Sequence, residues 1–348
     1  MRILVVGDLH LKFELSYSSA IKDGRREEWD NVKETIHDAS KTCDAVVLLG
    51  DTFNARHNHS SVIREFVDFL NGFGDKEVHI LVGNHERFGT ATALDFLKNI
   101  KHRKWLVYTE PTQTTITFIS GQSVMMVPFM TPALLGVETK EEGLKKIIKS
   151  FPKEKCPLAF CHQMIGGGKF NNLPVEMMNE IILPQKDMEK HFDHTFAGHL
   201  HNKQMISPNI YMTGNIFTQE MGECDKSVWI YEKSKIGKVK IEEVPLPTRG
   251  IYKLQLDQVT LPDLMKIPSN SIVKCIVTNR EISIDMVKKA LKRFDANIVI
   301  EQYPSERSKV HFEDGGLDLG VDNLLKLYAE AKKIVYEDLK TGFELIKQ

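Results

Sequence analysis

The sequence lacks the features that define several large classes of protein. Its five cysteines form no C-x-x-C pair, which argues against a disulfide framework and a structural zinc site and fits a reducing compartment. No apolar run reaches the ~18 residues that span a bilayer. The apolar start, MRILVVGD, is too short for a signal peptide. We therefore expect a cytoplasmic protein with no membrane segment.

The overall composition is that of a soluble globular protein, with 42% hydrophobic and 27% charged residues. The formal net charge of −1 argues neither for nor against a nucleic-acid partner. A chain of 348 residues is long for a single hydrophobic core, so we expect two or three domains.

Several short apolar runs end at residues that can bind metals. The runs at 2–6, 45–49, 79–82, 157–160 and 195–197 have the composition of buried strands. Between them, residues 26–43 and 61–73 show apolar side chains at helical spacing. Alternating strands and helices predict a largely parallel α/β sheet, whose active site lies at the carboxyl ends of the strands.

Strand-like runs become more frequent after about residue 115. They occur at 115–119, 123–128, 210–213, 227–232 and 238–244, with short connections. We interpret them as a second, more antiparallel sheet packed on the first. With helices on the outer faces, the two sheets form an α/β/β/α sandwich.

The strand ends carry eight side chains that can act on a metal or a substrate. They are Asp8, His10, Asp51, Asn84, His85, His162, His199 and His201. Carboxylate, imidazole and amide groups without thiolate suit Mn²⁺, Fe or Zn²⁺. The set is too large for one ion, but two ions ~3.5–4 Å apart and bridged by one carboxylate would use it. Such a pair activates a shared water and binds the oxygens of a phosphoester.

The stretch Gly83-Asn84-His85 has two interpretations. On its own it fits an ordinary turn, because Gly and Asn both tolerate positive φ. Within the full set, Asn84 supplies a neutral ligand oxygen and His85 remains free to act on the substrate. Asp51 is the natural bridging ligand, because it is the only candidate in its motif.

The motifs D-x-H, G-D, G-N-H-E, a single His and G-H-x-H follow one another at residues 8–10, 50–51, 83–86, 162 and 198–201. This order resembles the calcineurin-like metallophosphoesterases, which implies a four-layer α/β/β/α sandwich. The resemblance implies that Asp8, His10, Asp51 and His201 hold one metal and that Asp51, Asn84, His162 and His199 hold the other. It also implies that His85 contacts the scissile phosphate and protonates the leaving oxygen, for which imidazole is well suited.

The C-terminal third predicts two further parts. A strand at 271–278, a helix from Ser283 to about residue 294 and a strand at 297–303 form a small α+β unit. Residues 249–309 contain 11 Lys and Arg against 7 Asp and Glu, a net charge of +4. The helix carries the basic residues Lys288, Lys289, Lys292 and Arg293. An ordinary solvated helix face would explain them, but a basic cap beside a phosphodiester site also suits DNA.

The last segment shows an apolar stripe at near-helical spacing behind a glycine-rich hinge. Such a helix packs on its own domain or inserts into a groove of a partner. The stripe includes Leu324, Leu325, Tyr328, Val335 and Leu339. The expected domains are residues 1–247 (phosphoesterase), 248–312 (DNA-binding cap) and 313–348 (hinge and partner-binding helix).

This order of parts resembles the SbcD-type nuclease subunit of the SbcC–SbcD exonuclease, including bacteriophage versions. The resemblance implies exonuclease action on double-stranded DNA and endonuclease action on single strands, in DNA replication, recombination and repair. It implies two divalent ions, Mn²⁺ before Mg²⁺, a homodimer, and an SbcC-type ABC ATPase partner in a bacterial or phage-infected cytoplasm. Asn54 stands where the family usually has Asp or His, although its amide can still bind a phosphate.

Two other functions compete with the nuclease. A metallophosphatase or phosphodiesterase acting on a small nucleotide or a phosphoprotein would use the same metal residues, but it has no evident need of a basic cap and a partner helix. A non-catalytic scaffold would keep the fold, yet here every motif retains its metal-binding residue types. His57 and His59 lie in a loop before a Ser-capped helix, and we expect no metal there.

Overall fold

The computed structural model describes residues 1–13, 25–100, 104–116, 123–221, 223, 225–256, 264–269, 271–278 and 283–299, without the side chains of 295–299. The predicted hinge and C-terminal helix, with Leu324, Leu325, Tyr328, Val335 and Leu339, lie outside the described residues.

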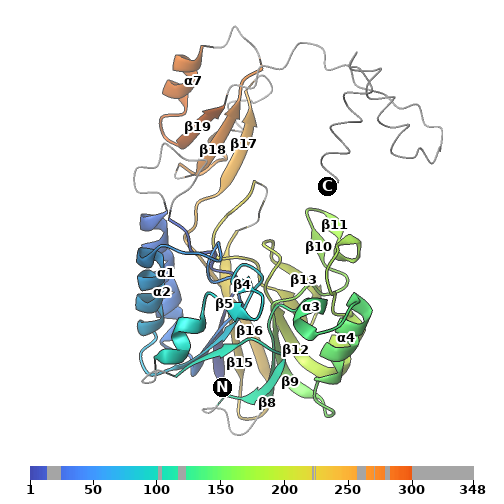
Figure 1. Cartoon of the computed structure of the whole chain (residues 1–348). Helices are drawn as coiled ribbons and strands as arrows, with labels where there is room; N and C mark the ends of the chain where they lie inside the picture. Colours follow the sequence, from blue (N-terminus) through green and yellow to red (C-terminus); the bar gives the residue numbers. More distant parts are fainter. Residues whose placement is uncertain are drawn as a thin grey trace, which may run out of the picture.

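The first sheet has the strand order β16-β15-β1-β2-β3-β6. Its strands are β1 (Arg2–Val6), β2 (Ala45–Leu48), β3 (Glu77–Leu81), β6 (Trp105–Tyr108), β15 (Ser227–Lys233) and β16 (Val239–Pro245). The first four are parallel, whereas β15 and β16 add in antiparallel fashion beside β1. Helices α1 (Arg26–Ser40) and α2 (Ser60–Asn71) connect β1 to β2 and β2 to β3, and they lie together at one side of the molecule (Figure 1).

The second sheet has the strand order β13-β14-β12-β9-β8-β7. Its strands are β7 (Thr112–Thr115), β8 (Ser123–Val127), β9 (Cys156–Cys161), β12 (Phe192–Ala197), β13 (Gln204–Ser207) and β14 (Ile210–Met212). Its helices are α3 (Pro132–Leu135), α4 (Lys140–Lys149) and α5 (Gln185–His191). The inner strands β8, β9, β12 and β14 are parallel, and only the edge strands β7 and β13 pair antiparallel.

The prediction of a more antiparallel second sheet was therefore wrong. Helices α3 and α4 lie between β8 and β9, and α5 lies between β9 and β12. A helical crossover returns the chain to the same end of the sheet, which makes the strands parallel. The runs near 227–232 and 238–244 join the first sheet. The strand expected at 115–119 lies mostly outside the described residues; the described strand there, β7, spans Thr112–Thr115.

Three hydrophobic cores separate four layers, as the α/β/β/α prediction requires. Alternating strand residues divide between them: Leu4 and Val6 of β1 pack with α1 and α2, whereas Ile3 and Val5 pack in the core between the two sheets. The third core joins the outer face of the second sheet to α3, α4 and α5 through Leu135, Ile147 and Met188.

Shorter elements lie in the connections that follow β3 and β9. They are β4 (Arg87–Phe88), β5 (Ala91–Thr92), β10 (Lys169–Phe170), β11 (Leu173–Pro174) and the 3₁₀ turns η1 (Asp95–Asn99) and η2 (Val175–Met177). Helix α2 is capped by the His59 side chain, which accepts a hydrogen bond from the Ser61 N–H, and not by a serine.

The described part of the cap contains a parallel three-stranded sheet and helix α7. Its elements are β17 (Ile251–Gln255), β18 (Ile272–Ile276), α7 (Ile284–Ala290) and β19 (Asp295–Val299), with β18 in the centre of the sheet. Val287 and Leu291 pack against Val273 and Cys275 of β18, so the cap has a small core of its own.

Candidate metal centre

The side chains expected to bind metal all follow the carboxyl ends of strands. Asp8 and His10 follow β1, Asp51 follows β2 and Asn84 follows β3. In the second sheet, His162 follows β9, and His199 and His201 follow β12. Because the two sheets face each other, these two sets of loops meet at one edge of the sandwich.

The residues form two clusters with ligand atoms close enough to share an ion. In the first, the ligand atoms of Asp8, His10 and His201 lie within 4.8 Å of one another. Nε2 of His201 and Nε2 of His10 are 3.1 Å apart.

The second cluster contains Asp51, His162 and His199, again with ligand atoms within 4.8 Å. The Asn84 side-chain oxygen belongs to it, because Oδ1 lies 3.2 Å from Nε2 of His162 and 3.0 Å from Nδ1 of His199.

Asp51 lies between the two clusters. Its Oδ2 is 3.3 Å from Nε2 of His162 and 3.7 Å from Nε2 of His10. One carboxylate therefore faces both sets of ligands, the position that a bridging ligand requires.

The backbone is strained around these ligands. His10, Asp51 and His199 have positive φ of 42°, 43° and 79°, a region that side chains other than glycine rarely adopt. The motif glycines allow close approach: a Cβ on Gly83 would collide with Asp51, and one on Gly198 would collide with Asp8. The sequence motifs therefore encode the tight packing of the loops as well as the ligands.

The cluster concentrates charge in a buried place. Burial, opposed by His162 and reinforced by Asp51, raises the pKa of Asp8 to about 6. Burial alone would lower the pKa of His162, but Asp51 and Asp8 raise it to about 10. Two buried carboxylates thus hold a proton on a neighbouring imidazole, and a divalent cation can replace that positive charge. The donor types and this electrostatic environment fit two divalent cations.

His85 lies at the edge of the centre, with its side chain 38% exposed. Its Nδ1 is 2.9 Å from the backbone oxygen of Asn54, and its backbone N–H donates to Oδ1 of Asp51. Nε2 lies 3.9 Å from Oδ2 of Asp51. Since the carbonyl can only accept, Nδ1 carries the proton and Nε2 faces the metal cluster. His85 also lies within ligand distance of His10 and Asp51, so the geometry alone would allow it to bind metal.

Asn54 lies beside the metal centre, whereas the predicted basic residues lie on the cap. Asn54 contacts His85 through its main chain, so this contact does not depend on its side chain. Lys288, Lys289, Lys292 and Arg293 are exposed on or just after α7. The Arg293 guanidinium donates to the Leu264 carbonyl and lies over the Phe294 ring, which gives it a role within the cap.

Three carboxylates that the motifs did not single out contact this centre. Glu86 accepts hydrogen bonds from the N–H groups of Phe53 and Gly83, both at 2.8 Å. Burial and Asp51 raise its pKa to about 8. Glu180 contacts His199, and Glu223 contacts His201. Glu86 is part of the G-N-H-E motif and could have been found there, whereas nothing in the local sequence marks Glu180 or Glu223.

Residues 1–203 match the family model described as calcineurin-like phosphoesterase. The chain belongs to the calcineurin-like phosphoesterase family. Its members hydrolyse phosphoesters with two divalent metal ions, and the two clusters fit such a binuclear site. The family match covers the five motifs and ends just after the last one.

Solved structures with some similarity include a protein named as a 5′-nucleotidase from Staphylococcus aureus, in complex with α-ketoglutarate. It is 15% identical, with a TM-score of 0.44 over 70% of this chain and 54% of its own length. Another is an uncharacterised, predicted phosphoesterase from Streptococcus pneumoniae, 12% identical, with a TM-score of 0.28 over 70% of this chain and 97% of its own. This chain thus spans about half the length of the first. No curated protein matches the sequence. Among the described residues, no helix is long and apolar enough to cross a membrane.

Proposed function

We propose that this phosphoesterase is a Mn²⁺-dependent DNA nuclease of the SbcD type. In this proposal it degrades double-stranded ends and cuts single strands, as a homodimer with an SbcC-type ABC ATPase that binds the segment 313–348. Residues 1–247 form the catalytic domain and residues 248–312 the DNA-binding cap. The proposal rests on the five motifs, on the cap and on one structural observation about where the cap meets the metal centre.

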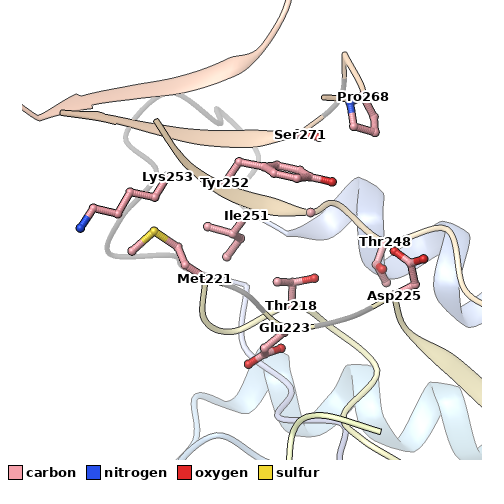
Figure 2. A pocket seen from close by; sticks show the side chains of 11 residues that line it. Thr218, Met221, Glu223, Asp225, Thr248, Ile251, Tyr252, Lys253, Pro268 and Ser271 are labelled. Carbon is pink, nitrogen blue, oxygen red and sulfur yellow. The ribbon is translucent and has the colours of Figure 1, made fainter. Parts of the chain in front are cut away.

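That observation is a cavity of 470 Å³ shared by the cap and the metal-centre loop. Figure 2 shows its lining: Tyr252 and Lys253 come from β17 of the cap, and Thr218, Met221 and Glu223 come from the loop before β15. Glu223 contacts the metal-cluster residue His201. Glu223 thus forms part of the cavity wall and also contacts the cluster, so a substrate bound under the cap would lie next to the metal-centre loop. The Lys253 ammonium at the edge of this cavity would attract a phosphate group.

The chain's own residues account for several steps of phosphodiester hydrolysis. The two divalent cations, when bound, supply an activated water and neutralise the phosphate charge. The Nδ1–H of His85 donates to the Asn54 carbonyl, which keeps Nε2 turned toward the cluster. In its doubly protonated form the ring would transfer the Nε2 proton to the leaving oxygen and keep the Nδ1 proton. The buried carboxylates Asp8 and Asp51 would hold the cations, because both lie almost entirely out of solvent beside the histidine ligands.

The cavity also supports a second candidate, hydrolysis of a small nucleotide. Its volume lies within the ~300–1,000 Å³ of small-molecule sites. Its charged lining residues are Lys253, Glu223 and Asp225, which is less basic than a site dedicated to a DNA backbone. A direct comparison of the two substrate classes is therefore needed.

The test is digestion of end-labelled linear duplex by the purified full chain in Mn²⁺ or Mg²⁺. Bis-nitrophenyl phosphate and nucleoside 5′-monophosphates are assayed alongside, and His85→Ala serves as the inactive control. We expect Mn²⁺-dependent shortening of the duplex that is lost in the variant by ~10²–10⁴-fold, the usual contribution of a positioned acid. Rapid hydrolysis of a monophosphate with the duplex intact, even after addition of the ATPase partner, would favour the nucleotidase.

Two lysine variants test the role of the cap. Lys253→Ala removes a cation that lines the cavity, whereas Lys289→Ala removes an exposed cation of α7 that does not line it. If DNA crosses the cavity, Lys253→Ala raises the KM for duplex more than Lys289→Ala does and leaves the small ester unaffected. The opposite order would place the DNA on α7, as the sequence pattern predicts.

A further inference from the structure

Two histidines of the metal centre face it with opposite ring nitrogens. His199 has Nδ1 3.0 Å from Oδ1 of Asn84, and its Nε2 is 2.8 Å from Oε2 of Glu180. His201 has Nε2 3.1 Å from Nε2 of His10, and its Nδ1 is 3.3 Å from Oε1 of Glu223. Each imidazole therefore has one nitrogen in a metal cluster and the other on a carboxylate.

We infer that Glu180 and Glu223 are positioning residues that set the tautomer and ring orientation of His199 and His201, and so the affinity of each metal cluster. A carboxylate accepts the N–H of the outer nitrogen and leaves the lone pair of the inner nitrogen on the metal side. Glu180 selects Nδ1 of His199 as the metal-facing atom, and Glu223 selects Nε2 of His201. The inference depends on the metal centre and not on whether the substrate is DNA.

Glu223 is held rigidly enough for this role. Its side chain is only 4% exposed, and Oε2 accepts a hydrogen bond of 2.6 Å from the Lys226 ammonium. The backbone N–H groups of Gln219 and Glu220 also donate to it, at 3.1 and 3.0 Å. Lys226 donates further to the backbone oxygen of His201, so the same cation fixes both the carboxylate and the main chain of the histidine.

Glu180 is positioned from the other side of the centre. It lies between η2 and α5, directly before Ile181. The Gln163 side chain donates to the Ile181 carbonyl at 2.7 Å and exchanges hydrogen bonds with the backbone of Met130. Gln163 is fully buried and follows the cluster residue His162. The segment that carries Glu180 is thus attached to the strand end that carries a metal ligand.

The two carboxylates contact histidines of different clusters, so variants of each should affect a different Mn²⁺ binding event. His199 belongs to the cluster with Asp51 and His162, and His201 belongs to the cluster with Asp8 and His10. Calorimetric titration of the full chain with Mn²⁺ resolves two binding events if the clusters differ in affinity. We expect Glu180→Ala to weaken one event and Glu223→Ala the other, each by ~10–100-fold, the usual effect of removing such a partner. The double variant should weaken both.

Glutamine variants and a charge control separate positioning from simple electrostatics. Glu180→Gln and Glu223→Gln keep an oxygen that can accept the imidazole N–H, so their affinities should fall between wild type and alanine. Glu220→Ala removes an exposed carboxylate from the same loop as Glu223 and should leave both events unchanged. Thermal unfolding confirms that each variant is folded, and the glutamine variant replaces Glu223→Ala if loss of the Lys226 partner unfolds the chain.

Two results would overturn the inference. Wild-type Mn²⁺ affinity in the folded Glu180→Ala and Glu223 variants would show that the carboxylates do not control the histidines. Equal weakening by Glu220→Ala would show that only the local charge matters. Because Mn²⁺ binding is the readout, a failure here is distinct from failure of the nuclease proposal, which is read from DNA digestion.

Discussion

Glu86 offers the sharpest prediction about the architecture of the centre. Its carboxylate is fully buried and receives two backbone hydrogen bonds of 2.8 Å, from Phe53 in the loop after β2 and from Gly83 in the loop after β3. It therefore ties the loop of Asp51 to the loop of Asn84. The G-N-H-E motif includes this glutamate, but only the folded structure shows which two backbone groups it binds.

The magnitude follows from the two donors that Glu86→Ala leaves without a partner. A buried N–H left unsatisfied costs ~1–3 kcal/mol, so the variant should lose ~2–6 kcal/mol of unfolding free energy. Glu86→Gln keeps one acceptor oxygen but turns an N–H₂ toward the other donor, so roughly half of that loss should remain. Both variants should also bind Mn²⁺ more weakly, because one of the links between the two loops is weakened or lost, while the contacts of His85 with Asp51 and Asn54 remain.

Urea unfolding of the metal-free protein, followed by circular dichroism, measures these losses. Asp95→Ala is a control at an exposed site, since Asp95 also accepts one backbone N–H, from Thr92 at 2.9 Å, but its side chain is 39% exposed. Its ion pair with Lys98, at 2.6 Å, lies on the surface and contributes little. Water replaces the bond from Thr92, so the control should lose no more than the ~0.5–1.5 kcal/mol of an ordinary hydrogen bond. A Glu86→Ala variant as stable as the Asp95→Ala control would refute the reasoning.

Two further predictions concern a buried histidine and a loop residue. Burial lowers the pKa of His79 to about 4, so the unfolded chain binds more protons than the folded one between pH 6.5 and 4, and stability falls as pH falls through that window. The wild type should lose about 2 kcal/mol between pH 7 and pH 5 through this group, and His79→Gln, compared by urea unfolding at both pH values, should lack that part of the slope. Asn54→Ala should retain nearly full activity, because the carbonyl that orients His85 is unchanged. A loss of activity close to the ~10²–10⁴-fold expected for the general acid would instead indicate that the Asn54 side chain binds the substrate.

The positions of the metal-binding residues at the ends of the strands were predictable, because the sequence signals for both are local. Strand β1 (Arg2–Val6) and the other strands that end at the metal centre are short apolar runs, each followed closely by residues that can bind metal. One stretch of sequence therefore contains both the strand and its metal ligands. The order of strands in the second sheet was not predictable in the same way. Whether residues 227–233 pair with β1 or with the second sheet depends on contacts with strands more than 200 positions away.

The supporting carboxylates were not predictable for a related reason. Glu180 precedes His199 by 19 positions and Glu223 follows His201 by 22, with no periodic pattern between them. Their function exists only after the loops are folded over the sheets. Local sequence thus specifies the atoms that face the metals, while tertiary structure selects the atoms that orient them.

The start of α1 is another place where contacts between distant segments, and not the local sequence, determine the role of a residue. Arg25 and Glu28 are both buried, in a first turn where polar side chains normally face water. The Arg25 guanidinium donates to the Thr218 carbonyl in the loop beyond the last metal motif, and Glu28 accepts the Arg249 N–H in the linker to the cap, at 2.7 Å. Burying two charges is tolerable only when their partners are well placed. Here the two charges pair with each other, with Arg25 Nε 3.6 Å from Glu28 Oε2, and each side chain also makes one of the two backbone contacts. Through these contacts the first helix fixes the loop after the last metal motif and the linker before β17 relative to one another, although the three segments are far apart in the sequence.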